Sequence, residues 1–452
     1  MNILIINGSP AGDDSITLQT VRYLRKLFPG HEWLKLNAAP KLKALERDFT
    51  EAKELLQRAE LLLFAYPVYT FLAPAQLHSF IALVKESGVD LRGKAATQIS
   101  TSKHFYDVTA HEYIRLNCAD LGLRYLRGLS ADMEDLLTEK GREEARAFFA
   151  RVLWAMEKGI DETLAGPAAG TFSPVPVTIP DRGAARTNPK EVVIVADMGP
   201  EDKALAAMVG RFRSICPSPT CVVNIRDFAF AGGCLGCFRC AASGECFYKD
   251  GFAKLLREQI QKAAATVYAF SIRDHSMGYR FKYYDDRQFC NGHRTVTMGK
   301  PVGYLVDGPL SAEPNLRLLL EARAQVGGNH LSWIAGNEED TDGEIDRLAA
   351  ELDYDLRTDY RESANFYGVG GMKIFRDLIY TMQGLMREDH RFYKKHGFYK
   401  DFPQRHRGKI AAMYLVGSLM NSPRLSQKLG SNMTKGMLMP YRKALEKVKP
   451  AE

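Results

Sequence analysis

Residues 1–10 read MNILIINGSP, an apolar run that ends in a loop of small and turn-forming residues. From Ser15 onward, apolar residues recur at the spacing of a helix. A strand, a tight loop and a helix in this order direct backbone N–H groups and the positive end of the helix at an anion, commonly a phosphate. We therefore expect a buried strand over residues 3–6 and an anion-binding loop after it, with hydroxyl donors from Ser9, Ser15 and Thr17.

The alternation of strands and helices continues through the first third of the chain. Further strands are predicted over residues 33–36, 61–65, 95–99 and 123–126, with helical patterns between them and a long helix over 139–158. Strands that alternate with helices build a doubly wound parallel sheet, whose ligand site lies beyond the carboxyl ends of the strands. The loops after the third and fourth strands are rich in Tyr and Phe, whose rings can sandwich a flat heterocycle.

Two of these loops carry a resemblance to a known family. The sequence NGSP at residues 7–10 and the sequence YPVY at 66–69 resemble the flavodoxin-like NAD(P)H-dependent FMN reductases. The resemblance implies that the first loop holds the FMN phosphate and that the second lies along the flavin ring. The implied residues are Ser9, Pro10, Ser15 and Thr17 for the phosphate, Pro67, Val68 and Tyr69 for the ring, and Ser100, Thr101, Ser102, His104 and Phe105 for its other edge. Asp13 and Asp14 share the first loop, so their carboxylates must point outward or cap the helix.

The order of elements then repeats. Residues 161–190 are rich in Pro and Gly without periodicity, which predicts a linker between a first domain at 1–160 and a second at 191–353. Strands are predicted over residues 192–195, 221–225, 265–270, 302–306 and 331–334 of the second domain. We therefore expect two tandem flavodoxin-like, doubly wound, five-stranded parallel sheets. The counterpart of the phosphate loop, ADMGP at 196–200, has an acid and no hydroxyl, so no flavin is expected there.

The second copy carries a compact cysteine motif, which we call the Cys box: GGCLGCFRCAASGECFYKD at residues 232–250. Cys234, Cys237, Cys240 and Cys246 are separated by two, two and five residues, and the glycines allow tight turns. This spacing favours a [4Fe–4S] cluster, because structural zinc sites usually pair two Cys-x-x-Cys knuckles across a longer loop. Zinc, a redox disulfide pair and idle thiols are the alternatives. The position of the motif resembles the iron–sulfur flavoproteins, which implies a [4Fe–4S] cluster next to FMN.

Two other regions lie outside this pattern. The polar and aromatic stretch 282–287, with His293 nearby, is interpreted as an insertion that lines a substrate pocket or covers the cluster. Residues 354–452 are predicted to form a mostly helical extension. From Arg387 to the end, this extension has 15 Lys and Arg residues but only 5 Asp and Glu residues, a charge of +10 in a chain whose net charge is +7. Such a tail could contact nucleic acid, acidic lipid or an acidic protein partner, or it is a solvated helical face. The remaining cysteines, Cys118, Cys216, Cys221 and Cys290, are expected to be buried thiols.

Composition limits the function classes. Hydrophobic residues make up 46% and charged residues 25%, as in an ordinary soluble protein, and no apolar run reaches the ~18 residues of a membrane span. The N-terminus does not read as a signal peptide, so we expect a cytoplasmic protein with reduced cysteines.

Taken together, the motifs predict a homo-oligomeric oxidoreductase containing FMN and a [4Fe–4S] cluster. It would pass electrons between NAD(P)H or a reduced carrier and a small-molecule or protein acceptor, with no role for nucleic acid. The alternatives are a non-enzymatic electron carrier and a zinc-stabilised scaffold protein.

Overall fold

The computed structural model describes residues 1–163, 172–181, 183, 185–402 and 405–420. The chain divides into two compact units, residues 1–391 and 392–452. Parts of the predicted linker and of the predicted C-terminal extension lie outside the described residues. Within the described part of the chain, no helix is long and apolar enough to cross a membrane.

The first sheet is parallel, with strand order β2-β1-β3-β4-β5. Its strands are β1 (Asn2–Asn7), β2 (Glu32–Leu36), β3 (Leu61–Pro67), β4 (Ala95–Ser102) and β5 (Arg124–Tyr125). β3 and β4 are almost wholly buried, which is why their sequences are continuous runs of apolar or small residues. A single fifth strand was predicted, but a further short strand, β6 (Leu129–Asp132), also pairs with β4, so the edge of the sheet is built from two segments.

The second sheet repeats this topology. Its strands are β7 (Val192–Ala196), β8 (Thr220–Asn224), β9 (Ala265–Ser271), β10 (Pro301–Asp307) and β11 (His330–Ala335). Their order, β8-β7-β9-β10-β11, matches that of the first sheet strand for strand. The predicted pair of flavodoxin-like sheets is therefore confirmed. We call residues 1–160 the first half and residues 191–353 the second half.

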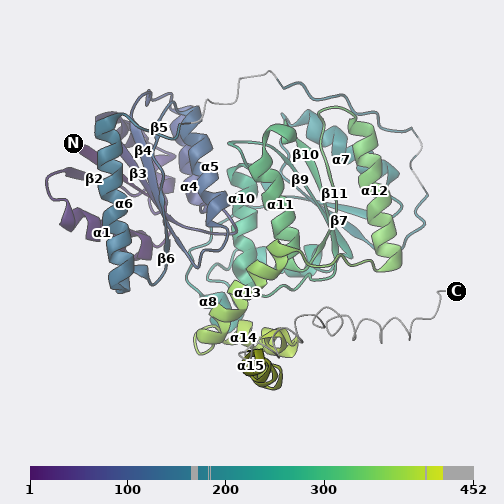
Figure 1. The fold of residues 1–452 in the computed structure, drawn as a ribbon. Coiled ribbons are helices and arrows are strands. Elements are labelled where there is room, and N and C mark those ends of the chain that lie inside the picture. The colour runs from purple at the N-terminus through teal and green to yellow at the C-terminus, as the bar shows by residue number, and fades with distance from the viewer. Residues whose placement is uncertain (164–171, 182, 184, 403–404, 421–452) are drawn as a thin grey trace. The chain divides into compact units, whose positions relative to one another are not determined.

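Helices cover both faces of each sheet (Figure 1). In the first half they are α1 (Ile16–Leu27), α2 (Leu42–Leu45), α3 (Thr50–Arg58), α4 (Ala75–Glu86), α5 (Asp107–Asp120) and α6 (Glu139–Lys158). In the second half they are α7 (Lys203–Ile215), α8 (Arg239–Ser243), α9 (Phe252–Leu255), α10 (Gly278–Arg287), α11 (Pro314–Gly327) and α12 (Thr341–Thr358). The apolar sides of α1 and α6 pack on one face of the first sheet, and those of α7 and α12 on one face of the second.

The other two sheet faces share one core. Buried side chains of α4, such as Leu77 and Phe80, belong to the same hydrophobic cluster as Phe281 and Tyr284 of α10. The two helices pack against each other between the sheets (Figure 1). The stretch 282–287, interpreted from the sequence as an insertion, forms the last part of α10, which follows β9 as α4 follows β3.

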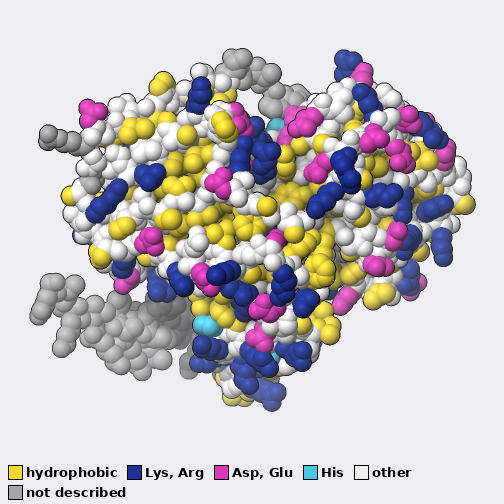
Figure 2. All heavy atoms as spheres, turned by 180° about the vertical axis from the view of Figure 1, so that it is seen from behind, with side chains coloured by type: hydrophobic (Ala, Val, Ile, Leu, Met, Phe, Trp, Pro, Cys, Tyr) yellow, Lys and Arg dark blue, Asp and Glu magenta, His cyan; other side chains and the backbone are white. Residues whose placement is uncertain are grey.

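Three more helices follow the second half: α13 (Phe366–Thr381), α14 (Arg387–Lys395) and α15 (Arg407–Met420). The mostly helical extension is therefore confirmed within the described residues. On the face seen in Figure 2, Lys and Arg side chains over the two halves are interspersed with Asp and Glu instead of forming one basic patch.

Candidate cofactor site between the two halves

A cavity of about 300 Å³ is lined by both halves of the chain and by α13. Three loops of the first half reach it, each at the carboxyl end of a strand: those after β1, β3 and β4. The second half contributes the Cys box and the residues that follow α10. We call this space the cofactor cavity. Of the residues implied by the family resemblance, the cavity is lined by Ser9, Ser15, Thr17, Pro67, Val68, Tyr69, Thr101, Ser102 and Phe105.

The loop after β1 presents hydroxyl groups to the cavity. The Ser15 side chain caps α1 by accepting a hydrogen bond from the Leu18 N–H (3.4 Å). The hydroxyl of Thr17 is buried and has no hydrogen-bond partner among the described residues. Asp13 is exposed and ion-paired with Lys35 (2.7 Å) and Arg22 (3.1 Å), and the hydrogen bond from Lys35 lowers its pKa. Asp13 is therefore held by two cations away from the cavity, whereas Asp14, the second acid of this loop, lines the cavity.

The loop after β3 forms a tight turn with an unusual backbone. The backbone groups of Tyr69 and Leu72 bond each other (2.8 and 3.0 Å) across Thr70 and Phe71, whose φ angles are +40° and +71°. Side chains with Cβ atoms occupy this left-handed region at a cost of about 1–2 kcal/mol per residue. The surrounding structure must therefore hold the turn in place, and this degree of local strain is characteristic of ligand-binding loops.

The loop after β4 provides two more hydroxyls. Those of Thr101 and Ser102 are buried without hydrogen-bond partners among the described residues, and both side chains line the cavity. Lys103 also lines it, with its ammonium group paired to Asp132 (2.8 Å).

Three residues named from the resemblance do not line the cofactor cavity: Pro10, Ser100 and His104. The Ser100 hydroxyl is bonded to His111 Nε2 (2.7 Å) instead. His104 is largely exposed and pairs with Asp107 (3.0 Å). Their assignment to the flavin stays a prediction.

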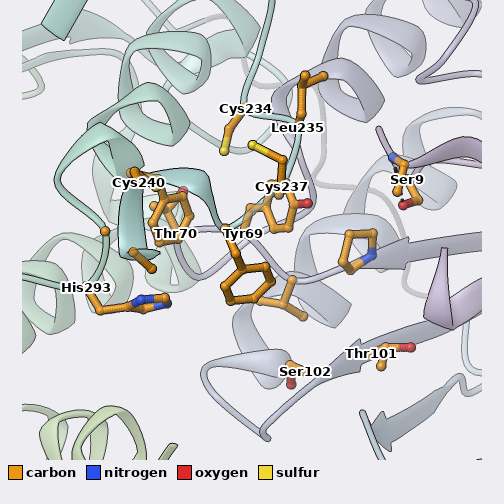
Figure 3. Close-up of a pocket in the computed structure, with 18 of the residues that line it drawn as sticks. Ser9, Tyr69, Thr70, Thr101, Ser102, Cys234, Leu235, Cys237, Cys240 and His293 are labelled. Atoms are coloured by element: carbon orange, nitrogen blue, oxygen red, sulfur yellow. Dashed lines mark hydrogen bonds between the residues drawn. The ribbon is translucent and has the colours of Figure 1, made fainter. Parts of the chain in front are cut away.

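All four cysteines of the Cys box line the same cavity. Figure 3 shows Cys234, Cys237 and Cys240 on one side of the pocket, Ser9, Thr101 and Ser102 on the other, and Tyr69 between them. The Cys box touches the loop after β3, which we call the flavin loop, because a Cβ on Gly236 would lie 1.8 Å from the Tyr69 hydroxyl oxygen. Gln76 of α4 donates a hydrogen bond to the carbonyl oxygen of Cys234 (3.2 Å), a second tie between the halves.

The cysteines of the Cys box are free of disulfide bonds. None of the described cysteines forms a disulfide. Burial raises the pKa of Cys234 far above its ordinary value and that of Cys240 to about 11. Among the described residues, no three Cys, His, Asp or Glu side chains surround one point where a single metal ion would sit.

Arg287 and His293 belong to the region interpreted from the sequence as lining a substrate pocket or covering the cluster, and both line the cavity, whereas Cys290 and Phe375 were not identified as part of the site. Arg287 ends α10 and pairs with Asp250 (2.8 Å), while Cys290, His293 and Phe375 of α13 also line the cavity. Burial raises the pKa of Cys290 to about 12. The expectation that Cys290 is a buried thiol is confirmed, but its place at the cavity was missed because it lies 44 residues beyond Cys246. By contrast, Cys221 is exposed, so the expectation of burial is wrong there.

The donor groups present fit the two implied cofactors unequally. Three buried, unpartnered hydroxyls (Thr17, Thr101 and Ser102) and a loop of ring-bearing residues suit a phosphorylated, planar ligand such as FMN. The Cys box offers the sulfur ligands of a [4Fe–4S] cluster in type and number. In such a cluster each sulfur would bind a different iron, so the four would not have to meet at one point, although their side chains would have to turn toward a common centre.

The corresponding loop of the second half is occupied by its own ion pairs. Arg226 pairs with Asp197 (2.7 Å) and with Asp202 (2.8 Å), and Arg273 also reaches Asp202 (2.7 Å). A Cβ on Gly199 would lie 2.0 Å from an Arg226 nitrogen, so the guanidinium fills the space beside this loop. The space beside this loop is therefore taken up by protein side chains, and whether the second half binds a flavin stays a prediction.

Comparisons with known proteins support the fold. Residues 1–138 match a protein family described by its flavodoxin-like fold. Among solved structures, the chain is similar to an FMN-dependent NADH-azoreductase from Bacillus anthracis (16% identity, 34% of this chain and 99% of that chain, TM-score 0.28). It is also similar to an NAD(P)H:quinone oxidoreductase from Methanothermobacter marburgensis (15% identity, 35% of this chain and 96% of that chain, TM-score 0.28). A third similar structure is the Trp repressor binding protein from Bacillus subtilis (18% identity, 32% of this chain and 96% of that chain, TM-score 0.26). A comparison with curated proteins found no match.

Proposed function

We propose that this chain is an oxidoreductase that binds FMN in the first half and a [4Fe–4S] cluster in the Cys box. It exchanges electrons with NAD(P)H or a reduced carrier and with a small-molecule or protein acceptor. The observation that carries the proposal is that the three flavin loops and the four cysteines line one cavity. FMN accepts an electron pair and releases single electrons, whereas a cluster takes one electron at a time.

The protein's own groups have separate tasks in this proposal. The hydroxyls of Thr17, Thr101 and Ser102 bind the phosphorylated ligand. Tyr69, packed on Gly236, keeps the ring-binding loop in contact with the Cys box. α13 closes the cavity through Phe375, whose ring stacks on Phe105 (centroids 4.3 Å apart) and limits the entry of water.

The first test is chemical analysis of protein purified without oxygen. The proposal requires FMN, iron and sulfide in the sample, two flavin bands in the blue region, and a broad shoulder that dithionite bleaches. Turnover of NAD(P)H with a viologen or a quinone separates an enzyme from an electron carrier, which would show little. A colourless, zinc-containing sample would instead favour the scaffold alternative.

A pair of variants tests the two binding sites separately. Cys237→Ser should remove iron and sulfide and leave FMN in place, because only the cluster uses this thiol. Cys221→Ser, an exposed cysteine outside the cavity, is the matched control and should retain both cofactors.

Thr17→Val should raise the stability of the flavin-free protein but lower its affinity for FMN. It removes a buried hydroxyl that lacks a partner, so the flavin-free protein should gain stability, while FMN affinity falls about 3- to 10-fold with the loss of one hydrogen bond. Calorimetry of the flavin-free protein and FMN titration measure the two effects. Unchanged FMN affinity would place the phosphate elsewhere.

A further inference from the structure

A second cavity of about 170 Å³ adjoins the cofactor cavity. It lies against the second sheet and α11, with walls from Tyr268, Tyr304, Arg294, Val296 and Arg323. Drug-sized ligands occupy pockets of ~300 Å³ or more, so this space suits a molecule of one ring. We call it the side cavity.

A single layer of rings separates the two cavities. Phe105, Phe289, His293 and Phe375 line both of them. Their ring centroids are 4.3 Å apart for Phe105 and Phe375, 5.0 Å for Phe375 and His293, and 5.6 Å for His293 and Phe289. A ligand in the side cavity would therefore lie one ring away from the loops that line the cofactor cavity, against aromatic faces and edges that suit another flat ring.

The charges around the side cavity cancel in pairs. Arg323 pairs with the buried carboxylate of Asp285 (2.5 Å), and Arg294 pairs with that of Asp389 (3.2 Å). Neither guanidinium needs an anionic ligand, and a charged ligand would lose its hydration without gaining an unpaired counter-ion. The electrostatics therefore favour an uncharged occupant.

Two hydrogen-bond donors at this cavity are unused. The Tyr304 hydroxyl belongs to a residue that is 3% exposed, and it has no hydrogen-bond partner among the described residues. The side-chain nitrogen of Asn291, a residue 6% exposed, likewise donates to no described group. Neither atom is itself closed off from solvent, so a ligand in this cavity that carries accepting oxygens would satisfy both donors in place of water.

We propose that the side cavity is a second binding site, for an uncharged single-ring aromatic molecule with a hydrogen-bond-accepting oxygen. The site is distinct from the cofactor cavity and requires neither FMN nor the cluster. Its place beside the ring layer brings the occupant close to any flavin held by the first half.

The test uses two ligands of the same shape and different charge. Benzamide is neutral and benzoate is anionic, and neither is reduced or reacts with thiols. Binding to the full-length purified protein, without an electron donor, is followed by saturation-transfer NMR and titration. We expect saturable binding of benzamide and at least about tenfold weaker binding of benzoate, because the anion loses hydration at a site whose cations are already paired.

Two variants locate the binding. Tyr304→Phe should weaken benzamide binding about 3- to 10-fold through the lost hydrogen bond. Val296→Trp adds a large ring at a wall position that is 41% exposed and should weaken it at least as much. Leu137→Trp, at a position that is 78% exposed and lines neither cavity, is the control and should have no effect.

The inference is overturned if benzamide does not bind, if benzoate binds equally well, or if neither Tyr304→Phe nor Val296→Trp weakens benzamide. These outcomes do not depend on the redox proposal. A sample without flavin or iron would refute the proposed function and leave the benzamide result to decide the side cavity by itself.

Discussion

At the scale of single residues, Gly236 brings the Cys box into close contact with the loop after β3. Gly236 has φ +64°, and a Cβ there would lie 1.8 Å from the Tyr69 hydroxyl oxygen. Gly236→Ala should therefore carry two penalties: about 1–2 kcal/mol for the left-handed backbone and a further cost for displacing Tyr69. We expect a fall of more than about 2 kcal/mol in the free energy of unfolding, measured by urea denaturation.

Gly88 is the matched control for this substitution. Its φ is +61°, and nothing lies within 4 Å of the position that a Cβ would take. Gly88→Ala should show the backbone penalty alone, and Tyr69→Phe should reduce the difference between the two alanine variants. Equal losses at Gly88 and Gly236 would mean that the Cys box does not press on the flavin loop.

Local patterns predicted the residues that one segment brings to the site by itself. Thr17, Tyr69 and the four cysteines lie in the segments that come after β1, β3 and β8, so their motifs place them at the cavity. Cys290 and Phe375 reach it only through the packing of distant segments, which no local pattern records. Ser100 is one residue too deep in β4, where its hydroxyl is bonded to His111.

At the scale of elements, helix α10 stabilises the strained turn of the other half. The ammonium group of Lys282 donates to the Tyr69 carbonyl (2.9 Å) and to the Thr70 hydroxyl (2.5 Å), and it pairs with Asp286. Asp286 in turn accepts from the N–H of Ala75 at the start of α4 (2.8 Å). Both charged side chains are fully buried, so each depends on the other.

Lys282→Met should therefore lower the free energy of unfolding strongly. It keeps the aliphatic stem but leaves the Asp286 carboxylate buried and unpaired, at a cost of about 3–5 kcal/mol of unfolding free energy. FMN retention should fall as well, because the turn at Thr70 loses two of its ties. Denaturant unfolding and flavin content after gel filtration measure the two effects.

The control is a pair in solvent. Arg146 and Glu143 are both more than half exposed, and Arg146→Met should cost less than about 1 kcal/mol. Lys282→Met combined with Asp286→Leu should be milder than Lys282→Met alone, since no buried charge is stranded. If the two changes simply add, the pair is not the support of the turn.

The strands were predictable nearly to the residue, whereas α10 was not, and burial explains both. Strands such as β3 are buried on both faces and read as unbroken apolar runs. α10 buries Lys282, Asp285, Asp286 and Arg287, so its sequence has the polarity of an exposed insertion. A pattern based on hydrophobicity therefore misses α10, because the residues that this helix buries at the interface are polar.

At the scale of the whole α/β assembly, residues 1–391, the repeat of the fold was visible in the sequence but the joint site was not. The order of strands and helices predicted two sheets, and their identical strand order confirms them. How the halves pack depends on side chains of α4 and α10 that meet only in three dimensions. A cavity shared by the flavin loops and the Cys box follows from that packing alone.

The same interface should make stability depend on pH. His275 of the second half is hydrogen-bonded through Nδ1 to Glu313 (2.7 Å) and through Nε2 to Asp120 of the first half (3.1 Å). Lys85 ties Asp120 (2.6 Å) to Asp274 (2.9 Å) in the same cluster. With a carboxylate at each nitrogen, the imidazole is held as the cation: burial opposes the charge, but the two hydrogen bonds prevail and raise the pKa of His275 from 6.5 to about 9.

A pKa that is raised by folding gives stability that is fully present below pH 6.5 and is lost as the pH rises through about 9. We therefore expect the midpoint of thermal unfolding to fall between these values. His275→Gln should flatten that fall, because Gln keeps a hydrogen bond without a titrating proton. The pKa of His330 is also raised, by a hydrogen bond to Asp355 that outweighs its burial, so His330 contributes to the pH dependence in the same direction. The difference in thermal midpoint between the wild type and His275→Gln therefore isolates the contribution of His275. Parallel profiles for the two proteins would show that folding does not raise the pKa of His275, and that its two carboxylate partners do not stabilise the cation at this interface.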